Sequence, residues 1–344
     1  MPGPSQITIQ DVARAAGVSP ATVSRVLNGT AGVKPEKIEK VRAALAQFGY
    51  KANPFARSLL SEGLKVVGVL VPNLQDEFYG SIVTAIEKTL RAQGLQMMCA
   101  LGHDDVQAEQ EALSMLLERG LDGLILLADH LPDALLLDLK TRKVPFVLLN
   151  RSIPEVAEHC LRVDNFQGGH QATRHLLDLG HTRIAHLTGP LNRADTLGRY
   201  NGYLQALRDA GLEMDEALVL YAQDDNWSIE AGEAMTERLL ARTSFTAIFT
   251  ANDPLAVGAL KVLHRKGFRV PEDISIVGFD NRSISSWVSP ALTVMDYPKY
   301  RMGETAATHL IQMMSGQPTA PLPLLPLERI ERESTAARTA KRGK

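Results

Sequence analysis

Residues 8–27, TIQDVARAAGVSPATVSRVL, determine how the rest of this chain is organised. Thr8 and Asp11 have the spacing of a capping box, in which each side chain satisfies a free backbone amide at the start of a helix. Gly17 can adopt the positive φ that ends a helix. Between them, apolar residues recur at helical spacing, namely Val12, Ala13 and Ala16. The stretch therefore begins with one short amphipathic helix.

A second short helix is predicted directly after the glycine. Ser19 is a favourable N-cap, and Pro20 stands at the first helical position, where its missing amide hydrogen has no cost. The inward face carries Val23, Val26 and Leu27, and the outward face carries Ala21, Thr22, Arg25 and Asn28. Two short helices joined by a glycine-containing turn form a helix-turn-helix unit. The alternative is a helical hairpin within a larger core, but the second helix has too few apolar residues to be buried on all sides.

The charge distribution favours a polar partner for this region. Residues 1–61 hold eight Lys and Arg against three Asp and Glu, a balance of +5, whereas the whole chain has a net charge of −2. The remainder must therefore carry −7. A basic head on an acidic body is expected when only the head contacts phosphate groups.

At 344 residues the chain is long enough for two or three domains. Residues 1–51, which include a third helix opened by Pro35, are predicted to form a helical headpiece. Residues 52–63 contain a helix too short to be stable alone, so they are either a flexible linker or a helix that orders on a partner. Residues 333–344 are basic and lack apolar spacing, which predicts a disordered tail.

Between these segments, residues 64–332 alternate short apolar runs with amphipathic helices. The runs include VVGVLV (66–71), DGLILLA (122–128), RIAHLTG (183–189) and DISIVGFD (273–280). Such alternation is typical of parallel sheets covered by helices on both faces. The pattern from Val66 to Gly94 is repeated from Ile184 to Gly211. We therefore expect an all-α helix-turn-helix headpiece followed by an α/β core of two doubly wound parallel-sheet lobes, the layout of periplasmic-binding-protein-like folds.

Polar and aromatic side chains gather at or just after the predicted strand ends. They are Asp76, Phe78, Tyr79, Asn150, Asp195, Arg199, Trp227, Asn252 and Asp280. Ligands of such folds bind at the carboxyl ends of strands, in the cleft between the lobes. Carboxylates and amides bind hydroxyl pairs, and an indole stacks on the CH face of a sugar, so this set suits a polyhydroxylated ligand. Each carboxylate could instead be a helix cap, a role for which Asp253 before Pro254 is well suited.

Other features of the sequence argue against catalysis and export. The chain has two cysteines, Cys99 and Cys160, without metal-type spacing, which predicts a reduced compartment. No run approaches the roughly 20 apolar residues that span a bilayer, so we expect a cytoplasmic protein without a membrane partner. We find no nucleophile elbow, phosphate-binding loop, dinucleotide fingerprint or zinc-protease motif. The sequence therefore predicts no enzyme activity, no cofactor and no metal site.

The chain resembles the lac-repressor/galactose-repressor family of bacterial transcription regulators. The resemblance begins with DVARAAGVSPATVSRVLN and VKPEKIEKVRAALAQFGYKANPFARSLL and extends from about Ile7 to Arg332. Later blocks, in order, are VVGVLVPN, DGLILL, VPFVLLNRS, VDNFQGG, LGHTRIAHLTGP, FTANDPLAVGAL, VPEDISIVGFDN and PALTVMDYP. The resemblance implies that lobe 1 comprises about 64–163 plus 296–328, and lobe 2 about 164–295.

For DNA, the resemblance implies that Pro20 and Ala21 vary operator choice and that Arg25 contacts a base. Arg25 also lies on the outward face, from which it can bind a guanine edge. Leu59 matches an apolar wedge in the minor groove, with Ala56 as its small neighbour. The predicted DNA-binding set is Thr8, Ser19, Pro20, Ala21, Thr22, Arg25, Asn28, Ala56 and Leu59.

For the cleft, the resemblance implies an effector pocket that includes Asn150, Arg199, Asn252 and Asp280, with stacking from Phe78, Tyr79 and Trp227. Arg193 aligns with an effector contact in the purine-responsive branch, so a purine-like corepressor remains an alternative to a sugar-like effector. We expect a regulator, most simply a repressor, that binds a near-palindromic double-stranded DNA operator. Because the tail lacks the leucine heptad of tetrameric members, the expected assembly is a homodimer. Further alternatives are an α/β enzyme and a sugar-binding protein without a DNA role.

Overall fold

The computed structural model describes residues 7–27, 32–48, 65–222 and 227–338. The chain divides into two compact units, residues 1–65 and 66–344, which are described here one at a time. The predicted linker at 52–63 lies outside the described residues, as do Asn28, Ala56 and Leu59.

The described residues of the first unit form three helices. They are α1 (Ile9–Ala16), α2 (Pro20–Leu27) and α3 (Pro35–Phe48). The capping box is confirmed, because the Thr8 side chain accepts from the Asp11 amide and the Asp11 carboxylate accepts from the Thr8 amide. Gly17 ends α1 with φ of 63°. A small core joins all three helices, and it contains Val12, Ala13, Ala16, Val23, Val41 and Ala44.

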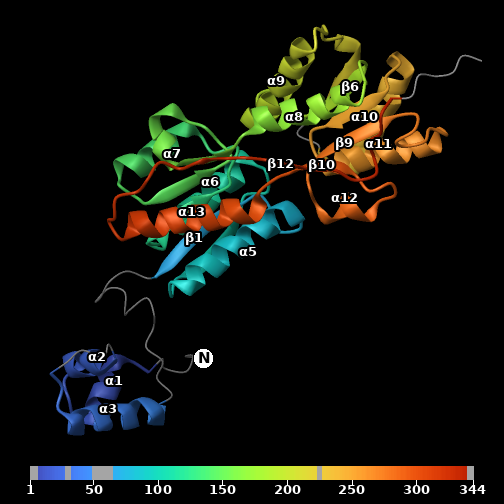
Figure 1. The fold of residues 1–344 in the computed structure, drawn as a ribbon. Helices are drawn as coiled ribbons and strands as arrows, with labels where there is room; N and C mark the ends of the chain where they lie inside the picture. Colours follow the sequence, from blue (N-terminus) through green and yellow to red (C-terminus); the bar gives the residue numbers. More distant parts are fainter. Residues whose placement is uncertain (1–6, 28–31, 49–64, 223–226, 339–344) are drawn as a thin grey trace, which may run out of the picture. The chain divides into compact units, whose positions relative to one another are not determined.

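The second unit holds two α/β lobes, as predicted (Figure 1). The sheet of lobe 1 has the order β11-β5-β4-β3-β1-β2, and its strands pair in parallel. Its strands are β1 (Val66–Val71), β2 (Gln96–Leu101), β3 (Gly123–Leu126), β4 (Phe146–Leu149), β5 (Cys160–Val163) and β11 (Leu324–Leu325). Its helices are α5 (Glu77–Ala92), α6 (Val106–Glu118), α7 (Asp133–Thr141), η1 (Pro154–His159) and α13 (Lys299–Met314).

The sheet of lobe 1 is buried on both faces. Alternate residues of β1, β3 and β4 point to a cluster that contains α5 and α13, and the intervening residues point to a second cluster with α6 and α7. A strand buried on both sides has a nearly continuous apolar sequence, which explains runs such as VVGVLV. Figure 1 shows α13 beside α5 although more than two hundred residues separate them in the sequence.

Lobe 2 repeats this plan with the sheet order β12-β10-β9-β8-β6-β7. Its strands are β6 (Ile184–Thr188), β7 (Val219–Tyr221), β8 (Ala247–Thr250), β9 (Ser275–Asp280), β10 (Thr293–Asp296) and β12 (Glu328–Ile330). Its helices are α8 (Asn165–Asp178), α9 (Ala194–Asp209), η2 (Glu216–Leu218), α10 (Ile229–Arg242), α11 (Asp253–Arg265) and α12 (Ser283–Trp287). Only β12, at the edge, runs antiparallel to its neighbour.

The chain passes between the lobes three times, after β5, after β10 and after β11. The third passage carries the chain into β12 and then along lobe 2. For residues 333–338, the prediction of a disordered tail at 333–344 is wrong. Ser334 is fully buried and its hydroxyl donates to the Ile276 carbonyl, and the Arg338 amide donates to the Leu179 carbonyl. The tail is ordered by these long-range hydrogen bonds rather than by apolar spacing.

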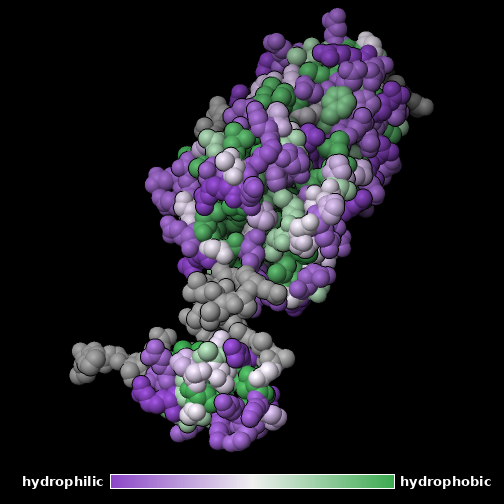
Figure 2. Space-filling view, turned by 90° about the vertical axis from the view of Figure 1, so that its left-hand side faces the viewer, coloured by the Kyte–Doolittle hydropathy of each residue, from purple (hydrophilic) through white to green (hydrophobic). Residues whose placement is uncertain are grey.

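Most side chains on the face drawn in Figure 2 are hydrophilic. On the face drawn in Figure 2, hydrophobic side chains occur in small groups among hydrophilic ones. Within the described ranges, every helix is too short or too polar to span a lipid bilayer.

Two glycines allow α8 and α9 to cross at close range. A Cβ atom on Gly202 would lie 2.1 Å from the Phe166 carbonyl oxygen, and one on Gly169 would lie 2.1 Å from the Arg199 carbonyl oxygen. Real atoms cannot approach so closely, so any larger residue must push the two backbones apart. This crossing holds α9, which carries Arg199, against α8 of the same lobe.

We predict that Gly202→Ala lowers the unfolding free energy of the core by about 1–3 kcal/mol, because the added methyl group overpacks a backbone contact. The control is Gly80→Ala in α5, where an added Cβ meets no atom within 4 Å. This control should raise stability by about 0.5–1 kcal/mol, since alanine favours a helix over glycine. Urea unfolding followed by circular dichroism measures both, and equal effects of the two variants would contradict the prediction.

Lobe 1 also buries a carboxylate beneath one of its loops. Glu109 of α6 is 1% exposed, and its Oε2 accepts from the backbone amide of His130 at 3.0 Å. Burial raises the pKa of Glu109 from an ordinary value of 4.5 to about 6. A pKa that is higher in the folded chain means that folding binds protons. The stability that protonated Glu109 contributes is therefore lost as the pH rises from 4.5 to about 6.

We predict that Glu109→Gln becomes more stable relative to the wild type as the pH rises from about 4.5 to 6, and that the difference then stays constant. The shift corresponds to about 2 kcal/mol at most. Glu118→Gln, at an exposed position of the same helix, is the control and should follow the wild-type profile. Thermal unfolding between pH 4 and 8 measures this, and parallel profiles for the wild type and Glu109→Gln would refute it.

Candidate functional site

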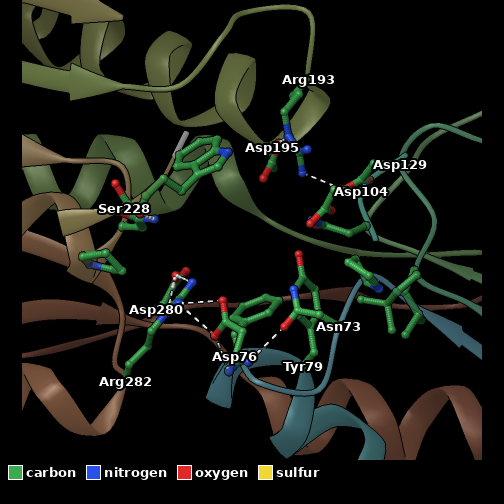
Figure 3. A pocket seen from close by; sticks show the side chains of 18 of the residues that line it. Asn73, Asp76, Tyr79, Asp104, Asp129, Arg193, Asp195, Ser228, Asp280 and Arg282 are labelled. Carbon is green, nitrogen blue, oxygen red and sulfur yellow. Dashed lines mark hydrogen bonds and ion pairs between the residues drawn. The ribbon is translucent and has the colours of Figure 1, made fainter. Parts of the chain in front are cut away.

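A cleft of about 620 Å³ lies between the two lobes of the core (Figure 3). It is lined by residues that follow β1, β2, β3 and β4 of lobe 1 and β6, β7, β8 and β9 of lobe 2. In parallel sheets the carboxyl ends of neighbouring strands lie at one edge, so the loops that follow them converge. The volume lies within the range of small-ligand pockets in proteins.

All ten side chains predicted for the effector line this one cleft. They are Asp76, Phe78, Tyr79, Asn150, Arg193, Asp195, Arg199, Trp227, Asn252 and Asp280. The structure adds lining residues that sequence reasoning did not select, namely Pro72, Asn73, Asp104, Leu127, Asp129, His130, Leu149, Ser228, Ile229, Glu230, Pro254 and Arg282.

Aromatic rings form two walls of the cleft. Phe78 packs edge-on against Tyr79 at 5.3 Å and against Tyr297 at 4.9 Å between ring centroids. On the other lobe, the indole of Trp227 lies directly against Gly189, where a Cβ atom would be 2.3 Å from the ring. The backbone therefore limits the position of the indole, and the Arg193 guanidinium lies over its ring at 5.9 Å from the centroid.

Arg199 is the most firmly held cation of the site. It is 4% exposed, and its Nε donates to Asn165 Oδ1 at 2.9 Å while Nη1 donates to the Ala251 carbonyl at 2.5 Å. Its Nη2 lies 3.9 Å from Asp195 and 4.0 Å from Asp280. Burial acts to raise the pKa of Asp195, but the charges of Arg193 and Arg199 outweigh it and lower that pKa. Arg199 therefore orders the acidic groups of lobe 2.

The turn that carries Asp280 has an unusual backbone. Asp280 has φ of 97° and Asn281 has φ of 54°, conformations that residues other than glycine rarely adopt. Lys299 donates from Nζ to the carbonyl oxygens of both residues, and Arg332 donates to Asn281 Oδ1 at 2.7 Å. Burial raises the pKa of Asp280, against the opposing charges of Arg282, Arg199 and Lys299.

Two ion pairs join the lobes on opposite sides of the cavity (Figure 3). On one side, Nη1 of Arg282 in lobe 2 donates to both carboxylate oxygens of Asp76 in lobe 1 at 2.8 Å. On the other, Nη2 of Arg193 in lobe 2 donates to Asp129 Oδ2 in lobe 1 at 2.6 Å. The structure therefore shows the cleft with its lobes bridged at both sides.

A third polar contact between the lobes lies beside the first. The Glu77 carboxylate accepts from the Ser283 amide at 3.0 Å and from the Ser283 hydroxyl at 2.7 Å. Asp76 is the N-cap of α5 and Glu77 is its first residue, so the start of this helix supplies two of the three contacts described here.

The expectation that Asp253 caps a helix is wrong. Asn252 has the extended backbone of an N-cap, and its Oδ1 accepts from the Leu255 amide at 3.0 Å. The Nδ2 of Asn252 donates to the Trp227 carbonyl at 3.2 Å, so both polar atoms of this predicted ligand residue have structural partners. Asp253 is instead buried beneath the turn, where its Oδ2 accepts from the Arg282 amide at 2.7 Å.

The adjacent acidic residues Asp104 and Asp105 occupy different positions. Asp105 caps α6 by accepting from the Ala108 amide, whereas Asp104 lines the cleft. Among the described residues, no group of three or more His, Cys, Asp or Glu is arranged to hold a metal ion.

In the headpiece, the predicted DNA-facing residues of α2 lie at its surface. Ser19 Oγ accepts from the Thr22 amide at 3.2 Å and lies 3.0 Å from the Thr22 hydroxyl, which confirms the N-cap. Pro20, Ala21 and Arg25 are exposed. Thr8 takes part in the capping box of α1.

Comparisons with known proteins match both units. Residues 8–53 match the family described as bacterial regulatory proteins, lacI family. Residues 64–336 match the periplasmic binding proteins and sugar binding domain of the LacI family. The HTH-type transcriptional regulator GalR of Escherichia coli (strain K12) is 35% identical over 90% of each chain.

Solved structures show the same relationship. The lac repressor dimer bound to operator and the anti-inducer ONPF has a TM-score of 0.84 and 31% identity, over 97% of this chain and 100% of that chain. The complex of the transcriptional regulator CelR with cellobiose has a TM-score of 0.72 and 34% identity, over 96% of this chain and 100% of that chain. With both units matched, the chain belongs to the LacI family of bacterial regulatory proteins and is a DNA-binding transcriptional regulator with a helix-turn-helix and a sugar-binding type of effector domain.

Proposed function

We propose that this protein is a repressor that binds a near-palindromic operator as a homodimer and is controlled by a sugar-like effector in the cleft. The observation that carries the proposal is the set of aromatic and acidic side chains around a single cleft between two lobes. Because such an operator is chromosomal DNA, the proposal places the protein in the cytoplasm. It includes no catalytic role.

The chemistry of the cleft favours a sugar over a purine-like effector. Carboxylates and the Asn150 amide can accept and donate to hydroxyl pairs, and Trp227 offers a flat apolar surface to the CH face of a sugar ring. Arg193, which would be needed for a purine-like ligand, already donates to Asp129. The solved CelR structure, with a similar core, holds the disaccharide cellobiose.

The proposed DNA contacts come from the exposed face of α2. Arg25 is suited to a guanine edge, and the small side chains of Pro20 and Ala21 allow close apolar contact with a base. The hydroxyls of Ser19 and Thr22 are proposed to bind phosphates, which fix register without reading sequence. Asn28, Ala56 and Leu59 complete the proposed set, and they lie outside the described residues.

The proposed dimer brings two headpieces to half-sites about one helical turn apart. The lac repressor, a structural relative, was solved as a dimer on its operator. In our proposal the effector binds the DNA-competent and DNA-incompetent arrangements of the lobes with unequal affinity. Such coupling is necessarily reciprocal, so operator DNA must change effector affinity by the same factor.

The DNA assignment is tested by Arg25→Ala in the full chain, on operator duplexes selected from a randomised pool. We expect a loss of about 1–3 kcal/mol on the selected duplex and little change on random duplex, because only the first presents the matching base edge. Fluorescence anisotropy at one fixed salt concentration measures both.

The matched control for this test is Arg42→Ala. Arg42 is exposed on α3, where it pairs with Glu39 at 3.5 Å, so the substitution removes the same charge from another face. It should affect both duplexes alike. An Arg25→Ala protein with wild-type affinity for the selected duplex would rule out this role for Arg25.

The effector assignment is tested by Asp280→Asn, which keeps a side chain that tolerates positive φ but removes the carboxylate. Operator binding should survive. The sugar concentration that gives half of the full change in operator affinity should rise at least about tenfold, the equivalent of one lost hydrogen bond to a charged group. Anisotropy with a panel of neutral sugars, phosphosugars and purines provides the readout.

Asp138→Asn serves as the control for Asp280→Asn, because Asp138 is exposed on α7 and pairs with Arg142 away from the cleft. It should respond like the wild type. If Asp280→Asn responded to the same concentration of the same compound, Asp280 would have no part in effector binding.

A further inference from the structure

The cleft contains twice as many carboxylates as guanidinium groups. Its acidic lining residues are Asp76, Asp104, Asp129, Asp195, Glu230 and Asp280, and its basic ones are Arg193, Arg199 and Arg282. His130 is the remaining titratable group with a cationic form among the described lining residues. The local balance is therefore acidic, although the whole chain is close to neutral.

Each of the three guanidinium groups is already bonded to the protein. Arg282 holds Asp76 at 2.8 Å and Asp280 at 3.2 Å, and Arg199 is held by neutral and acidic partners on lobe 2. Arg193 is bonded to Asp129 at 2.6 Å and lies 3.5 Å from Asp195. All three cations of the cleft are thus held by groups of the protein, and two of them, Arg193 and Arg282, are bonded to carboxylates.

These pairs are largely removed from water. The side chains of Arg193 and Asp129 are 17% and 22% exposed, and those of Arg282 and Asp76 are 17% and 26% exposed. Charges interact more strongly where water is excluded, and an unpaired charge there is unfavourable. A phosphate or carboxylate ligand would have to displace a carboxylate from its guanidinium, or else add negative charge to an acidic cleft.

We infer that the cleft selects an uncharged, hydroxyl-rich ligand and that Asp129 is the residue that excludes phosphorylated ones, by occupying the guanidinium of Arg193. This inference rests on the proposed function and names the class of effector for the same cleft. The carboxylates of the cleft can still accept from hydroxyls through their remaining lone pairs. The Arg193 guanidinium, like that of Arg282, is neutralised by a carboxylate of lobe 1 across the cleft.

Asp129 is better suited to this role than the other carboxylates. Asp76 also caps α5, Asp195 accepts from the Thr196 amide, and Asp280 belongs to the positive-φ turn. Asp129 follows β3 of lobe 1, and the hydrogen bond described for its carboxylate is the one from Arg193 of lobe 2. Removing its charge should therefore release Arg193 toward the cavity with little effect on the fold.

The test compares the wild type with Asp129→Asn, Asp129→Glu and Asp138→Asn. Each full-length protein is titrated calorimetrically with neutral mono- and disaccharides, including glucose, galactose and cellobiose, and with glucose 6-phosphate and galactose 6-phosphate. Thermal unfolding and operator binding verify that each variant is folded. The measured quantity is the ratio of affinities for a neutral sugar and its phosphate ester.

We expect the wild type to prefer the neutral sugar at least tenfold. Asp129→Asn should shift this ratio at least tenfold toward the phosphate ester, because a charge-assisted bond to Arg193 becomes available. Asp129→Glu, which restores the carboxylate, and Asp138→Asn, which removes an exposed charge outside the cleft, should both keep the wild-type ratio.

Three results would overturn the inference. The first is a wild type that binds a phosphate ester as well as its neutral parent, and the second is an unchanged ratio in Asp129→Asn. In both cases sugar binding itself survives, so only the inference fails. The third is a wild type that holds its operator but binds no neutral sugar, which would overturn the proposed effector class as well.

Discussion

The arrangement of the core depends on the ion pairs of the Arg282 guanidinium. It bonds to Asp76 at the start of α5 in lobe 1 and to Asp280 at the end of β9 in lobe 2. The two sheets are separate, and the lobes are further joined by the chain, by an apolar cluster, by the Arg193–Asp129 pair and by the contact of Ser283 with Glu77. A single planar cation with several donors can satisfy carboxylates from both sides, which a lysine could not do in the same geometry.

The position of this guanidinium is fixed by the turn from which it projects. Positive φ at two consecutive residues costs about 1–3 kcal/mol at each, so the turn persists only because its surroundings determine it. Asp253 holds the Arg282 amide, Lys299 holds two carbonyl oxygens, and Arg332 holds the Asn281 side chain. These three residues come from α11, from the start of α13 and from the C-terminal segment. A ligand that contacts Asp280 therefore meets a turn connected to both lobes, to the start of α13 and to the C-terminal segment.

Much of this fold can be predicted from the sequence because its signals are local. The capping box needs only Thr8 and Asp11, which lie within one helical turn, and the turn after α1 needs only Gly17. The buried parallel strands have nearly continuous apolar runs. The short strands β11 and β12, of two and three residues, are too brief for any periodicity to be visible. Residues 333–338 looked unstructured because their hydrogen-bond partners lie on distant strands and loops.

The cleft shows the same division between local and distant information. Its ten predicted residues follow strand ends or match family positions, and both signals can be located along the chain. Asp129 and Arg282 also follow strand ends, but nothing near them in the sequence indicates their partners. Their partners are 64 and 206 positions away, so their roles are visible only when the lobes are brought together. Asn252 lines the cleft as expected, but its bond to the Trp227 carbonyl, 25 positions away, could not be inferred from its neighbours in the sequence.

The three passages between the lobes have a consequence for biosynthesis. Neither lobe is encoded by one continuous segment, since α13 and β11 of lobe 1 and β12 of lobe 2 all follow β10 in the chain. During translation, α5 stays without α13, the helix that packs against it, until nearly the whole polypeptide has been made. The nascent chain thus exposes apolar strands and an unpaired sheet edge for most of its synthesis, the kind of intermediate that chaperones protect. A premature stop anywhere before β11 leaves both halves of the sensor unfinished, even though every residue that lines the cleft has by then been made when the stop lies beyond Arg282.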